Sequence, residues 1–263
     1  MTISAYIIAF NEVEKISDCI NSVLWADEII VADSHSTDGT TELALELGAK
    51  VIHIPFNGYG DLRNQAISHC NGDWILSIDS DERCTKDVRD EIIKLVANAP
   101  LDIYRVPRKN FFMGRWIKYS GWYPNYRQPQ LFKKGTMAYT MDPVHEGFIS
   151  SSNKEIGKLK NNIWQFPFKN IEELINKANR YSTLGASKLQ KKGVKGSVFK
   201  AFLHGLWSFT KHYIFKLGFL DGGPGLVIAF GNFEGTFYRY IKLSEAQKKC
   251  TPPKVKKITK SST

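Results

Sequence analysis

The sequence predicts an α/β fold, in which a doubly wound and mostly parallel sheet is followed by a C-terminal helical region. Two observations carry this prediction. Over residues 1–100, short apolar runs alternate with amphipathic segments, which is typical of strands and helices in a parallel sheet. After residue 166, the apolar residues recur with a helical period. A chain of 263 residues is long enough for one large core with an appended region.

The predicted strands are short, and each is followed by a helix with one apolar side. The strands are expected over residues 3–9, 28–32, 51–54 and 74–78. The first helix carries its apolar residues on one face: Ile16, Ile20, Val23 and Leu24. The next helix is expected to end at Gly48, and two more to cover 59–69 and 86–96. In such a sheet, ligands bind beyond the carboxyl ends of the strands.

Polar side chains follow three of these strands, at the point where each strand ends. They are Asn11, Glu12, Asp33, Asp79 and Asp81. Asp79 and Asp81 are two residues apart, so on a continuing strand they would point the same way and could share a hard divalent cation. The alternatives are a solvated loop and, for Asp33, a turn residue at a helix entry. Acids at this edge suit ribose hydroxyls, base N–H groups and a metal that carries a diphosphate. Neither a G-x-G-x-x-G nor a P-loop motif is present.

The cysteines and the apolar runs exclude several classes of protein. Cys19, Cys70, Cys84 and Cys250 lie far apart with no C-x-x-C pair. Neither a disulfide framework nor a zinc motif is therefore expected, and a reducing compartment is the default. The first residues lack a basic segment and are expected to form a strand rather than a signal peptide. No uncharged apolar run reaches about 18 residues, so no transmembrane helix is expected.

The net charge of +10 is unevenly distributed along the chain. Residues 177–260 contain 17 Lys and Arg against three acidic residues, a balance of +14, so the rest of the chain sums to −4. A strongly basic C-terminal part indicates an anionic partner, either nucleic acid or an anionic membrane surface.

Four segments within residues 1–100 match, in order, the motifs of one enzyme family. Ala9-Phe10-Asn11-Glu12 resembles its P-x-[YF]-N-E, and residues 30–40, IVADSHSTDGT, resemble its V-D-D-x-S-x-D-G-T. Arg63-Asn64-Gln65-Ala66 resembles its R-N-x-A, and Asp79-Ser80-Asp81 resembles its D-x-D. On these motifs, the segment resembles the nucleotide-sugar-binding half of a family 2 glycosyltransferase with the GT-A fold. Ala9 and Ala32 depart from the family, which usually has Pro and Asp there.

The resemblance implies a UDP-sugar donor site along the strand ends. The nucleotide-sugar-binding residues would include the turn after the first strand: Ala9, Phe10, Asn11 and Glu12. Asp33 would read the uracil, Arg63 would meet the base or the diphosphate, and Asp79 would lie near the ribose and the metal. Asp81 would hold Mn²⁺ or Mg²⁺ on the diphosphate.

Aromatic and cationic residues crowd together between residues 104 and 148. Trp116, Trp122 and Tyr123 are candidates for contacting an acceptor, because flat apolar rings beside cationic donors suit a carbohydrate face. The alternative is an irregular segment that covers the core. His145 and Glu146 follow. A titratable pair after the donor half is a candidate base, because an inverting sugar transfer needs a group that takes the acceptor's proton.

The segment Val144-His145-Glu146 narrows the resemblance. With Gly121-Trp122-Tyr123-Pro124 and Leu131-Phe132, it resembles the lipopolysaccharide-core β-1,4-glucosyltransferase subfamily, and the likeness runs to about Leu243. The resemblance implies that Glu146 is the catalytic base and that His145 is its neighbour, for which a structural hydrogen bond is the alternative. The subfamily usually has a metal-binding His where this chain has Gln165. An amide oxygen can also ligate a hard cation, but more weakly.

Three helices are expected after residue 166, over residues 171–192, about 198–217 and 226–241. In the second, one face collects Phe199, Phe202, Leu203, Leu206, Trp207, Phe209, Thr210, Tyr213, Ile214 and Leu217. The other face collects Lys200, His204, Lys211, His212 and Lys216, with Phe215 as the one large apolar residue on that basic side. The helices form a subdomain packed on the sheet, an interfacial membrane anchor, or both. The Lys- and Pro-rich tail is expected to be disordered.

These patterns predict a catalytic domain of the GT-A type over residues 1–165, with a nucleotide-sugar half at 1–100 and an acceptor half at 101–165. An amphipathic helical region over 166–247 and a basic tail over 248–263 follow. The predicted activity is a metal-dependent, inverting transfer of a hexose, glucose from UDP-glucose, to a lipid-linked saccharide such as the lipopolysaccharide inner core. The predicted location is the cytoplasmic face of a bacterial inner membrane, where the protein is peripheral.

Two alternatives to this activity are kept open by the sequence. A polyprenyl-phosphate glycosyltransferase shares the donor half, but it usually ends in transmembrane helices or has another acceptor motif. A basic nucleic-acid-binding protein would use residues 177–260. The aromatics there follow a helical apolar face rather than a stacking platform, so no nucleic-acid partner is expected.

Overall fold

The structure of the chain is a computed structural model, which describes residues 1–124, 126, 128–141 and 147–248. The chain divides into two compact units, Met1–Lys169 and Asn170–Thr263. The division falls after Lys169. The sequence placed the end of the catalytic domain at residue 165, four residues earlier.

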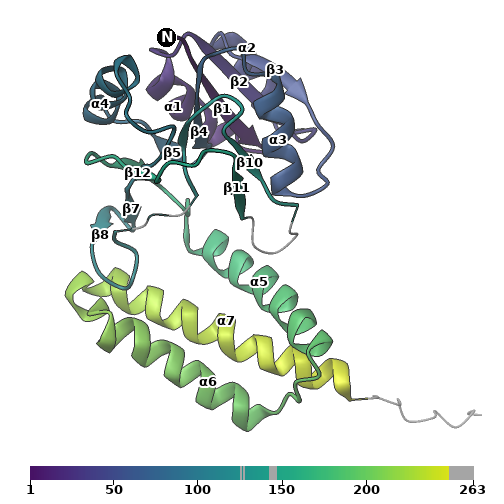
Figure 1. Cartoon of the computed structure of the whole chain (residues 1–263). Helices are drawn as coiled ribbons and strands as arrows, with labels where there is room; N and C mark the ends of the chain where they lie inside the picture. Colours follow the sequence, from purple (N-terminus) through teal and green to yellow (C-terminus); the bar gives the residue numbers. More distant parts are fainter. Residues whose placement is uncertain (125, 127, 142–146, 249–263) are drawn as a thin grey trace, which may run out of the picture. The chain divides into compact units, whose positions relative to one another are not determined.

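The first unit is built on a seven-stranded sheet with the strand order β12-β6-β9-β4-β1-β2-β3 (Figure 1). Its strands are β1 (Ile3–Ala9), β2 (Glu28–Asp33), β3 (Lys50–His53), β4 (Trp74–Asp79), β6 (Ile103–Arg105), β9 (Leu131–Lys133) and β12 (Gly157–Lys158). Strands β3, β2, β1 and β4 are parallel, whereas β9 is antiparallel to both β4 and β6. The predicted α/β fold with a mostly parallel sheet is confirmed.

Helices cover both faces of this sheet, so it is doubly wound. They are α1 (Val13–Val23), α2 (Thr40–Glu46), α3 (Tyr59–His69) and α4 (Lys86–Ala97). One face packs against α1, α2 and α4 through residues such as Ile20, Ala44 and Ile92. The other face packs against α3 through Leu62 and Ala66. Apolar cores on both sides explain why the central strands are almost continuous apolar runs.

The register of the parallel strands brings their carboxyl ends to one edge. Ala9 at the end of β1 lies opposite Asp33 of β2, and Ile8 lies opposite Asp79 of β4. The residues that follow these strands therefore meet at this edge, as predicted for a ligand site in such a sheet.

A smaller four-stranded sheet and a hairpin complete the first unit. The small sheet has the order β5-β13-β7-β8 and consists of β5 (Glu82–Arg83), β13 (Ile163–Gln165), β7 (Arg108–Phe112) and β8 (Arg115–Ile117). The hairpin pairs β10 (Met137–Tyr139) with β11 (Phe148–Ser150). Part of the aromatic segment, including Phe111, Phe112 and Trp116, is therefore strand, whereas Trp122 and Tyr123 lie outside the strands. Because β5 follows β4 so closely, the acidic turn between them lies where the two sheets meet.

One predicted core position in this unit is wrong. Leu24 was expected on the apolar face of the first helix, but its side chain is 55% exposed. The helix ends at Val23, and Leu24 is its C-cap, so the residue lies beyond the turn that packs on the sheet. The buried face consists of Ile16, Cys19, Ile20 and Val23.

The second unit is helical. It contains α5 (Ile171–Lys191), α6 (Val198–Thr210), the π-helical turn η1 (Lys211–Phe215), the 3₁₀ turn η2 (Gly218–Asp221) and α7 (Gly223–Gln247). The side chains of Asn170 and Ser197 cap α5 and α6, because they accept hydrogen bonds from the backbone N–H groups of Glu173 and Lys200. Helix α7 packs against both α5 and α6. Within the described residues, none of the helices combines the length and the apolar character needed to span a bilayer.

The expected helix over 198–217 is interrupted, which corrects the placement of Phe215. In η1 the N–H of Lys216 donates to the carbonyl of Lys211 at 2.9 Å, an i→i+5 hydrogen bond. Such a turn advances less than 100° per residue, so Phe215 does not reach the basic side. Its ring lies instead against that of Trp207, with the centroids 5.7 Å apart.

Candidate active site

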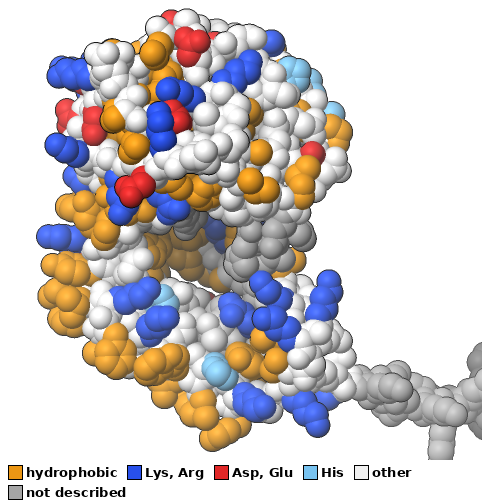
Figure 2. All heavy atoms as spheres, viewed as in Figure 1, with side chains coloured by type: hydrophobic (Ala, Val, Ile, Leu, Met, Phe, Trp, Pro, Cys, Tyr) orange, Lys and Arg blue, Asp and Glu red, His pale blue; other side chains and the backbone are white. Residues whose placement is uncertain are grey.

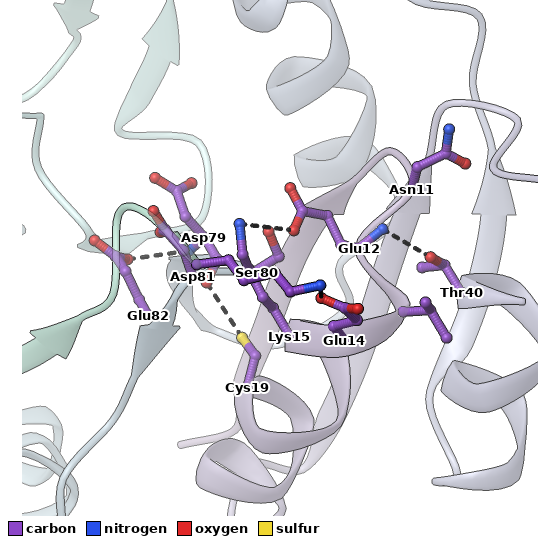
Figure 3. Close-up of polar contacts among 12 residues, drawn as sticks. Asn11, Glu12, Glu14, Lys15, Cys19, Thr40, Asp79, Ser80, Asp81 and Glu82 are labelled. Carbon is purple, nitrogen blue, oxygen red and sulfur yellow. Dashed lines mark hydrogen bonds and ion pairs between the residues drawn. The ribbon is translucent and has the colours of Figure 1, made fainter. Parts of the chain in front are cut away.

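The turn after β1 is tied to the loop after β2 by hydrogen bonds. The backbone N–H of Asn11 donates to Ser36 Oγ at 2.8 Å, and Asn11 Oδ1 accepts from the N–H of Thr37 at 2.9 Å. The N–H of Glu12 donates to Thr40 Oγ1 at 2.9 Å (Figure 3). Asn11 has a φ of 54°, in the left-handed region that Asn tolerates better than most residues. Two of the predicted nucleotide-sugar-binding residues therefore also fix the shape of this edge.

The other two residues of that turn differ in exposure. Ala9 is buried at the end of β1, whereas the Phe10 ring is 60% exposed. Only Phe10 of the two offers a side-chain surface to a ligand.

Asp38, to which no role was predicted, anchors the same loop. Its carboxylate accepts hydrogen bonds from the backbone N–H groups of Val13 and Thr40, each at 3.1 Å. Burial raises the pKa of Asp38, but the hydrogen bonds from Thr40 and Val13 outweigh it and hold this pKa below its ordinary value. The ionised side chain thus joins the first turns of α1 and α2. The D-G-T part of the motif was the available signal.

Asp33, the predicted uracil reader, is fully buried by the loop that follows it. Its Oδ2 accepts from the N–H of Ser36 at 2.9 Å, and its Oδ1 accepts from the Ser36 hydroxyl at 2.5 Å. His53 Nδ1 lies 3.3 Å from Asp33 Oδ2, and the rings of His53 and His35 stack with centroids 5.8 Å apart. Two exposed imidazoles, His53 and His35, therefore lie near Asp33, and sequence reasoning missed them.

Helix α3 presents Arg63 to the same edge. Its guanidinium donates from Nη2 to Asp79 Oδ1 at 2.7 Å and from Nη1 to Ser77 Oγ at 3.2 Å. The guanidinium also lies over the Tyr139 ring, 5.4 Å from its centroid. Arg63 and Asp79 were both predicted to meet the donor, and the fold brings them into direct contact.

The next residue of α3, Asn64, holds the hairpin. Asn64 Nδ2 donates to the carbonyl of Tyr139 at 2.9 Å, and the N–H of Tyr139 donates to Asn64 Oδ1 at 2.8 Å. One residue further along the hairpin, the N–H of Thr140 donates to the carbonyl of Gly147 at 3.0 Å. The catalytic candidates His145 and Glu146 lie outside the described residues, but both flanks of their segment are anchored beside α3.

Asp81 and Gln165 meet, although 84 positions separate them in the sequence. Gln165 Nε2 lies 3.2 Å from Asp81 Oδ1 and 3.3 Å from Oδ2. Pairing of β13 with β5 places Gln165 opposite Glu82, and the N–H of Phe166 donates to the Asp81 carbonyl at 2.8 Å. The amide nitrogen faces the carboxylate here. Rotation about the last side-chain bond would turn the oxygen to that side instead.

The acidic turn fits a hard cation that is shared with a ligand. Figure 3 shows Asp79, Asp81 and Glu82 gathered in the turn at the end of β4. In the part of the chain that the structure describes, no three His, Cys, Asp or Glu side chains form a group that could hold a metal ion. Mg²⁺ and Mn²⁺ accept carboxylate and amide oxygens together with water and phosphate oxygens. Asp79, Asp81 and Gln165 have the right chemistry for such a cation if a diphosphate supplies further ligands.

Glu82 lies directly behind this turn and is fully buried. It accepts hydrogen bonds from the N–H of Asp79 at 3.0 Å, from Gln130 Nε2 at 2.8 Å and from Arg108 Nε. Burial lowers the pKa of Arg108, but the nearby Glu82, Asp79 and Asp81 outweigh it, so this pKa is raised. The buried Arg108 guanidinium offsets the negative charge of three carboxylates within four residues. Sequence reasoning did not predict this role of Arg108, because Arg108 reaches the turn only through sheet pairing.

The predicted acceptor residues divide between two sides of the small sheet. Trp116 pairs with Phe111 across β7 and β8, and its ring meets Tyr123 edge-on with centroids 5.3 Å apart. Trp122 instead packs against Phe112, with ring centroids 6.0 Å apart. Because Phe111 and Phe112 are adjacent in one strand, they point to opposite faces. Trp116 and Trp122 therefore cannot contribute to one flat binding surface.

Comparison with known proteins gives one family. The sequence profile described as "Glycosyl transferase family 2" matches residues 4–157. An uncharacterized glycosyltransferase of Rickettsia felis is 34% identical over 262 residues, covering 93% of this chain and 90% of that protein. The lipopolysaccharide core biosynthesis glycosyltransferase LpsC of Rhizobium meliloti is 29% identical over 254 residues, covering 88% of this chain and 90% of its own length.

Two solved structures are similar to parts or most of the chain. Glucosyl-3-phosphoglycerate synthase from Mycobacterium tuberculosis, in complex with Mn²⁺, uridine diphosphate and glucosyl-3-phosphoglycerate, is 28% identical. It has a TM-score of 0.35 and covers 43% of this chain and 44% of its own. TarS 1–349 of S. aureus is 16% identical, with a TM-score of 0.49, and covers 94% of this chain and 91% of its own.

Proposed function

The chain belongs to glycosyl transferase family 2, and from this premise we propose that it is an inverting, metal-dependent hexosyltransferase that uses a UDP-sugar. The observation that carries the proposal is the acidic turn between β4 and β5. There Asp79 contacts Arg63 and Asp81 contacts Gln165, beside the ends of β1 and β2.

The donor would bind along the strand ends. Arg63 offers a guanidinium to the diphosphate or base, while its bond to Asp79 fixes it in place. Asp81, with Asp79 and Gln165, would hold Mn²⁺ or Mg²⁺. When bound, such a cation neutralises charge on the leaving diphosphate. Both oxygens of the Asp33 carboxylate accept hydrogen bonds from Ser36 and so hold the loop after β2. To contact the uracil, one of these oxygens would have to lose its hydrogen bond to Ser36.

Acceptor activation is assigned to Glu146 on the family resemblance, with His145 as its neighbour. The carboxylate takes the proton of the acceptor hydroxyl. At the same time the hydroxyl oxygen forms a bond to C1 of the sugar, and the bond between C1 and the diphosphate oxygen breaks. A single displacement of this kind inverts the configuration at C1. The two hydrogen bonds between Tyr139 and Asn64 of α3, the helix that also carries Arg63, support a base close to the donor.

The acceptor is proposed to be a lipid-linked saccharide such as the lipopolysaccharide inner core, and the donated sugar to be glucose. The likeness to LpsC, a lipopolysaccharide core biosynthesis glycosyltransferase, over most of the chain supports the acceptor class. Trp122 on one side of the small sheet, or Trp116 with Tyr123 on the other, would contact it. Because the proposed acceptor is lipid-linked, we propose that the enzyme acts at the cytoplasmic face of the inner membrane, next to an anionic surface.

A donor screen tests the proposed function. Purified protein is incubated with UDP-, GDP- and dTDP-sugars, with Mn²⁺ or with a chelator, and release of the nucleoside diphosphate is measured. Hydrolysis of UDP-glucose that needs the metal is expected. Equal hydrolysis in the chelator would contradict the metal role, and preference for GDP- or dTDP-sugars would contradict the UDP assignment.

Glu146→Gln tests the base. The change is nearly isosteric and removes only the proton acceptor, so turnover should fall by about 10²–10⁴-fold. UDP-sugar affinity, measured by calorimetry, should stay the same. His145→Ala should cost less, because His145 is assigned only to orient its neighbour. An active Glu146→Gln beside an inactive His145→Ala would move the base to His145. If both stay active, Asp142, which also lies outside the described residues, is the next carboxylate to test.

A further inference from the structure

Helix α6 meets α7 through two small residues and through aromatic rings beside them. Ala201 and Gly205 are buried, and a Cβ at Gly205 would come within 3.0 Å of the Phe233 ring. The rings of Phe202 and Phe209 contact those of Phe233 and Phe230. Other large apolar residues of α6 are exposed, namely Phe199, Leu203, Leu206 and Trp207, and Phe202 itself is still 50% exposed. Phe199 is 71% exposed and Trp207 is 59% exposed. A helix whose apolar stripe served only its own unit would bury that stripe.

The π-helical turn η1 extends this exposed surface. It brings Phe215, 65% exposed, against Trp207, and Ile214 is 48% exposed. We call the seven residues Phe199, Phe202, Leu203, Leu206, Trp207, Ile214 and Phe215 the α6–η1 face. Monomers rarely expose large apolar side chains side by side, and such a group marks a docking surface for protein or membrane.

Within α6 and η1 the charged side chains are of one sign. Residues 198–217 contain Lys200, Lys211 and Lys216 and no Asp or Glu, whereas α7 carries Glu234 and Glu245 together with Arg239 and Lys242. Lys200 and Lys211 are exposed beside the face. Figure 2 shows hydrophobic side chains along the margin of the helical unit, with Lys and Arg side chains beside them. Two copies seated face to face would bring these cations together, whereas an anionic surface would neutralise them.

The geometry of α6 excludes a span and suits an interface. With 13 residues the helix is about 20 Å long, shorter than the hydrocarbon core of about 30 Å. A helix with aromatic residues on one side and Lys beside them binds in the plane of the interface, with its apolar side in the outer acyl region. Trp207 is suited to this depth, because its ring is apolar and its N–H is polar.

We propose that the α6–η1 face inserts into one leaflet of an anionic bilayer, with the helix axis along the membrane and the flanking lysines against the headgroups. The inference deepens the proposed function, on which it rests for a membrane-bound acceptor, by naming the surface that meets the membrane. The η1 turn is part of it, because it is what turns Phe215 toward the membrane-facing side.

Co-sedimentation of the full chain with vesicles tests the inference. Vesicles of phosphatidylglycerol and phosphatidylcholine in equal parts are compared with vesicles of phosphatidylcholine alone. Trp207→Ser/Phe215→Ser should lower the partition coefficient by at least about tenfold, because two large apolar side chains no longer leave water. Leu45→Ser, which changes an exposed apolar residue on α2, is the matched control and should bind as the unmodified protein does.

Depth and charge are separated by two further measurements. Lipids with brominated acyl chains should quench tryptophan emission in the unmodified protein, and Trp207→Phe should bind equally but lose most of that quenching. Deletion from residue 249 onward should weaken binding at low salt only. Binding by the α6–η1 face should persist at about 0.5 M salt, where surface charges are screened.

Each outcome decides for or against the inference. Unchanged binding of Trp207→Ser/Phe215→Ser, with circular dichroism showing intact helices, would overturn it. The inference would also be overturned if the unmodified protein did not bind anionic vesicles but formed dimers in analytical sedimentation, and if the Trp207→Ser/Phe215→Ser variant were monomeric. Hydrolysis of UDP-sugars by the unmodified protein is assayed separately, without vesicles. If the protein binds vesicles through the α6–η1 face but hydrolyses no UDP-sugar, the proposed function is refuted and the membrane surface is not.

Discussion

Two carboxylates that are two positions apart in the sequence have different neighbours in this turn. Arg63 Nη2 donates to Asp79 Oδ1 at 2.7 Å, and Gln165 Nε2 donates to Asp81 Oδ1 at 3.2 Å. The Arg108 guanidinium also interacts electrostatically with both carboxylates. Asp81 is the first candidate to test for the metal, because it is the last residue of the segment that resembles the D-x-D motif.

Asp81→Ala should abolish transfer. Asp81 would act through the cation that it holds, and loss of a group that stabilises developing charge on the leaving group typically costs about 10²–10³-fold in turnover or more. The fold should survive, because crowded carboxylates repel one another. The free energy of unfolding should change by less than about 1 kcal/mol. Calorimetry with UDP and Mn²⁺ and urea unfolding measure the two effects. Asp90→Asn on α4 is the control for loss of charge, and near-normal turnover of Asp81→Ala would refute the metal role.

Gln165→His should tighten the metal site. A neutral imidazole binds Mn²⁺ better than an amide oxygen does, and position 165 already contacts Asp81. The Mn²⁺ concentration for half-maximal activity should fall by about tenfold. Mn²⁺ binding in the presence of UDP, followed by electron paramagnetic resonance, is the second readout. Gln190→His on α5 is the matched control. An unchanged Mn²⁺ affinity in a folded Gln165→His protein would mean that this position does not face the metal.

At the scale of elements, α3 has two functions on neighbouring residues. Arg63 reaches the acidic turn, and Asn64 holds β10 through two hydrogen bonds to Tyr139. The close approach of helix and hairpin depends on Gly60, where a Cβ would lie 2.0 Å from the carbonyl oxygen of Thr140. The R-N-x-A motif thus joins the donor edge to the segment that carries the candidate base.

Gly60→Ala should destabilise the protein although alanine favours helices. The helix gains about 1 kcal/mol from the substitution. The clash with backbone at Thr140 forces α3 and β10 apart, and overpacking of this kind costs about 1–3 kcal/mol. Urea unfolding should show a net loss, and turnover should fall more than UDP affinity because the hairpin moves. Ser68→Ala, exposed on the same helix, should not destabilise. A more stable Gly60→Ala protein would contradict the packing described.

At the scale of the whole molecule, the two units differ in charge and in what they bury. The apolar core residues around the main sheet all belong to the first unit, from Ile3 to Ile163. The second unit is basic and exposes its large apolar side chains along α6 and η1. The first unit has the composition of a domain that folds alone, and the second has that of a surface-binding module.

A fragment of residues 1–169 should fold and bind donor without the helical unit. We expect a cooperative thermal transition, and an affinity for UDP with Mn²⁺ within about threefold of the full chain, because every donor-site contact described lies inside the fragment. Binding to anionic vesicles should be lost. Circular dichroism, calorimetry and co-sedimentation measure the three. A folded fragment that still binds vesicles as the full chain does would place the membrane surface in the first unit.

The sequence by itself determined the elements and the edge at which the ligand site lies. Strand and helix periods are local properties, so the helix over 59–69 was predicted with the bounds that the structure gives. The carboxyl ends of parallel strands meet by rule, so Asn11, Asp33 and Asp79 could be placed together. Motif resemblance then named Arg63 and Gln165 as further members of the site.

Only the tertiary structure decided which side chains touch. The contact of Asp81 with Gln165 and the burial of Glu82 against Arg108 depend on β5, β13 and β7 pairing in one small sheet. The side of α6 that is exposed depends on how closely Gly205 lets α7 approach, and the place of Phe215 depends on one π turn. A local pattern records which residues share a face. It does not record which neighbour covers that face, because the neighbour comes from a distant part of the chain.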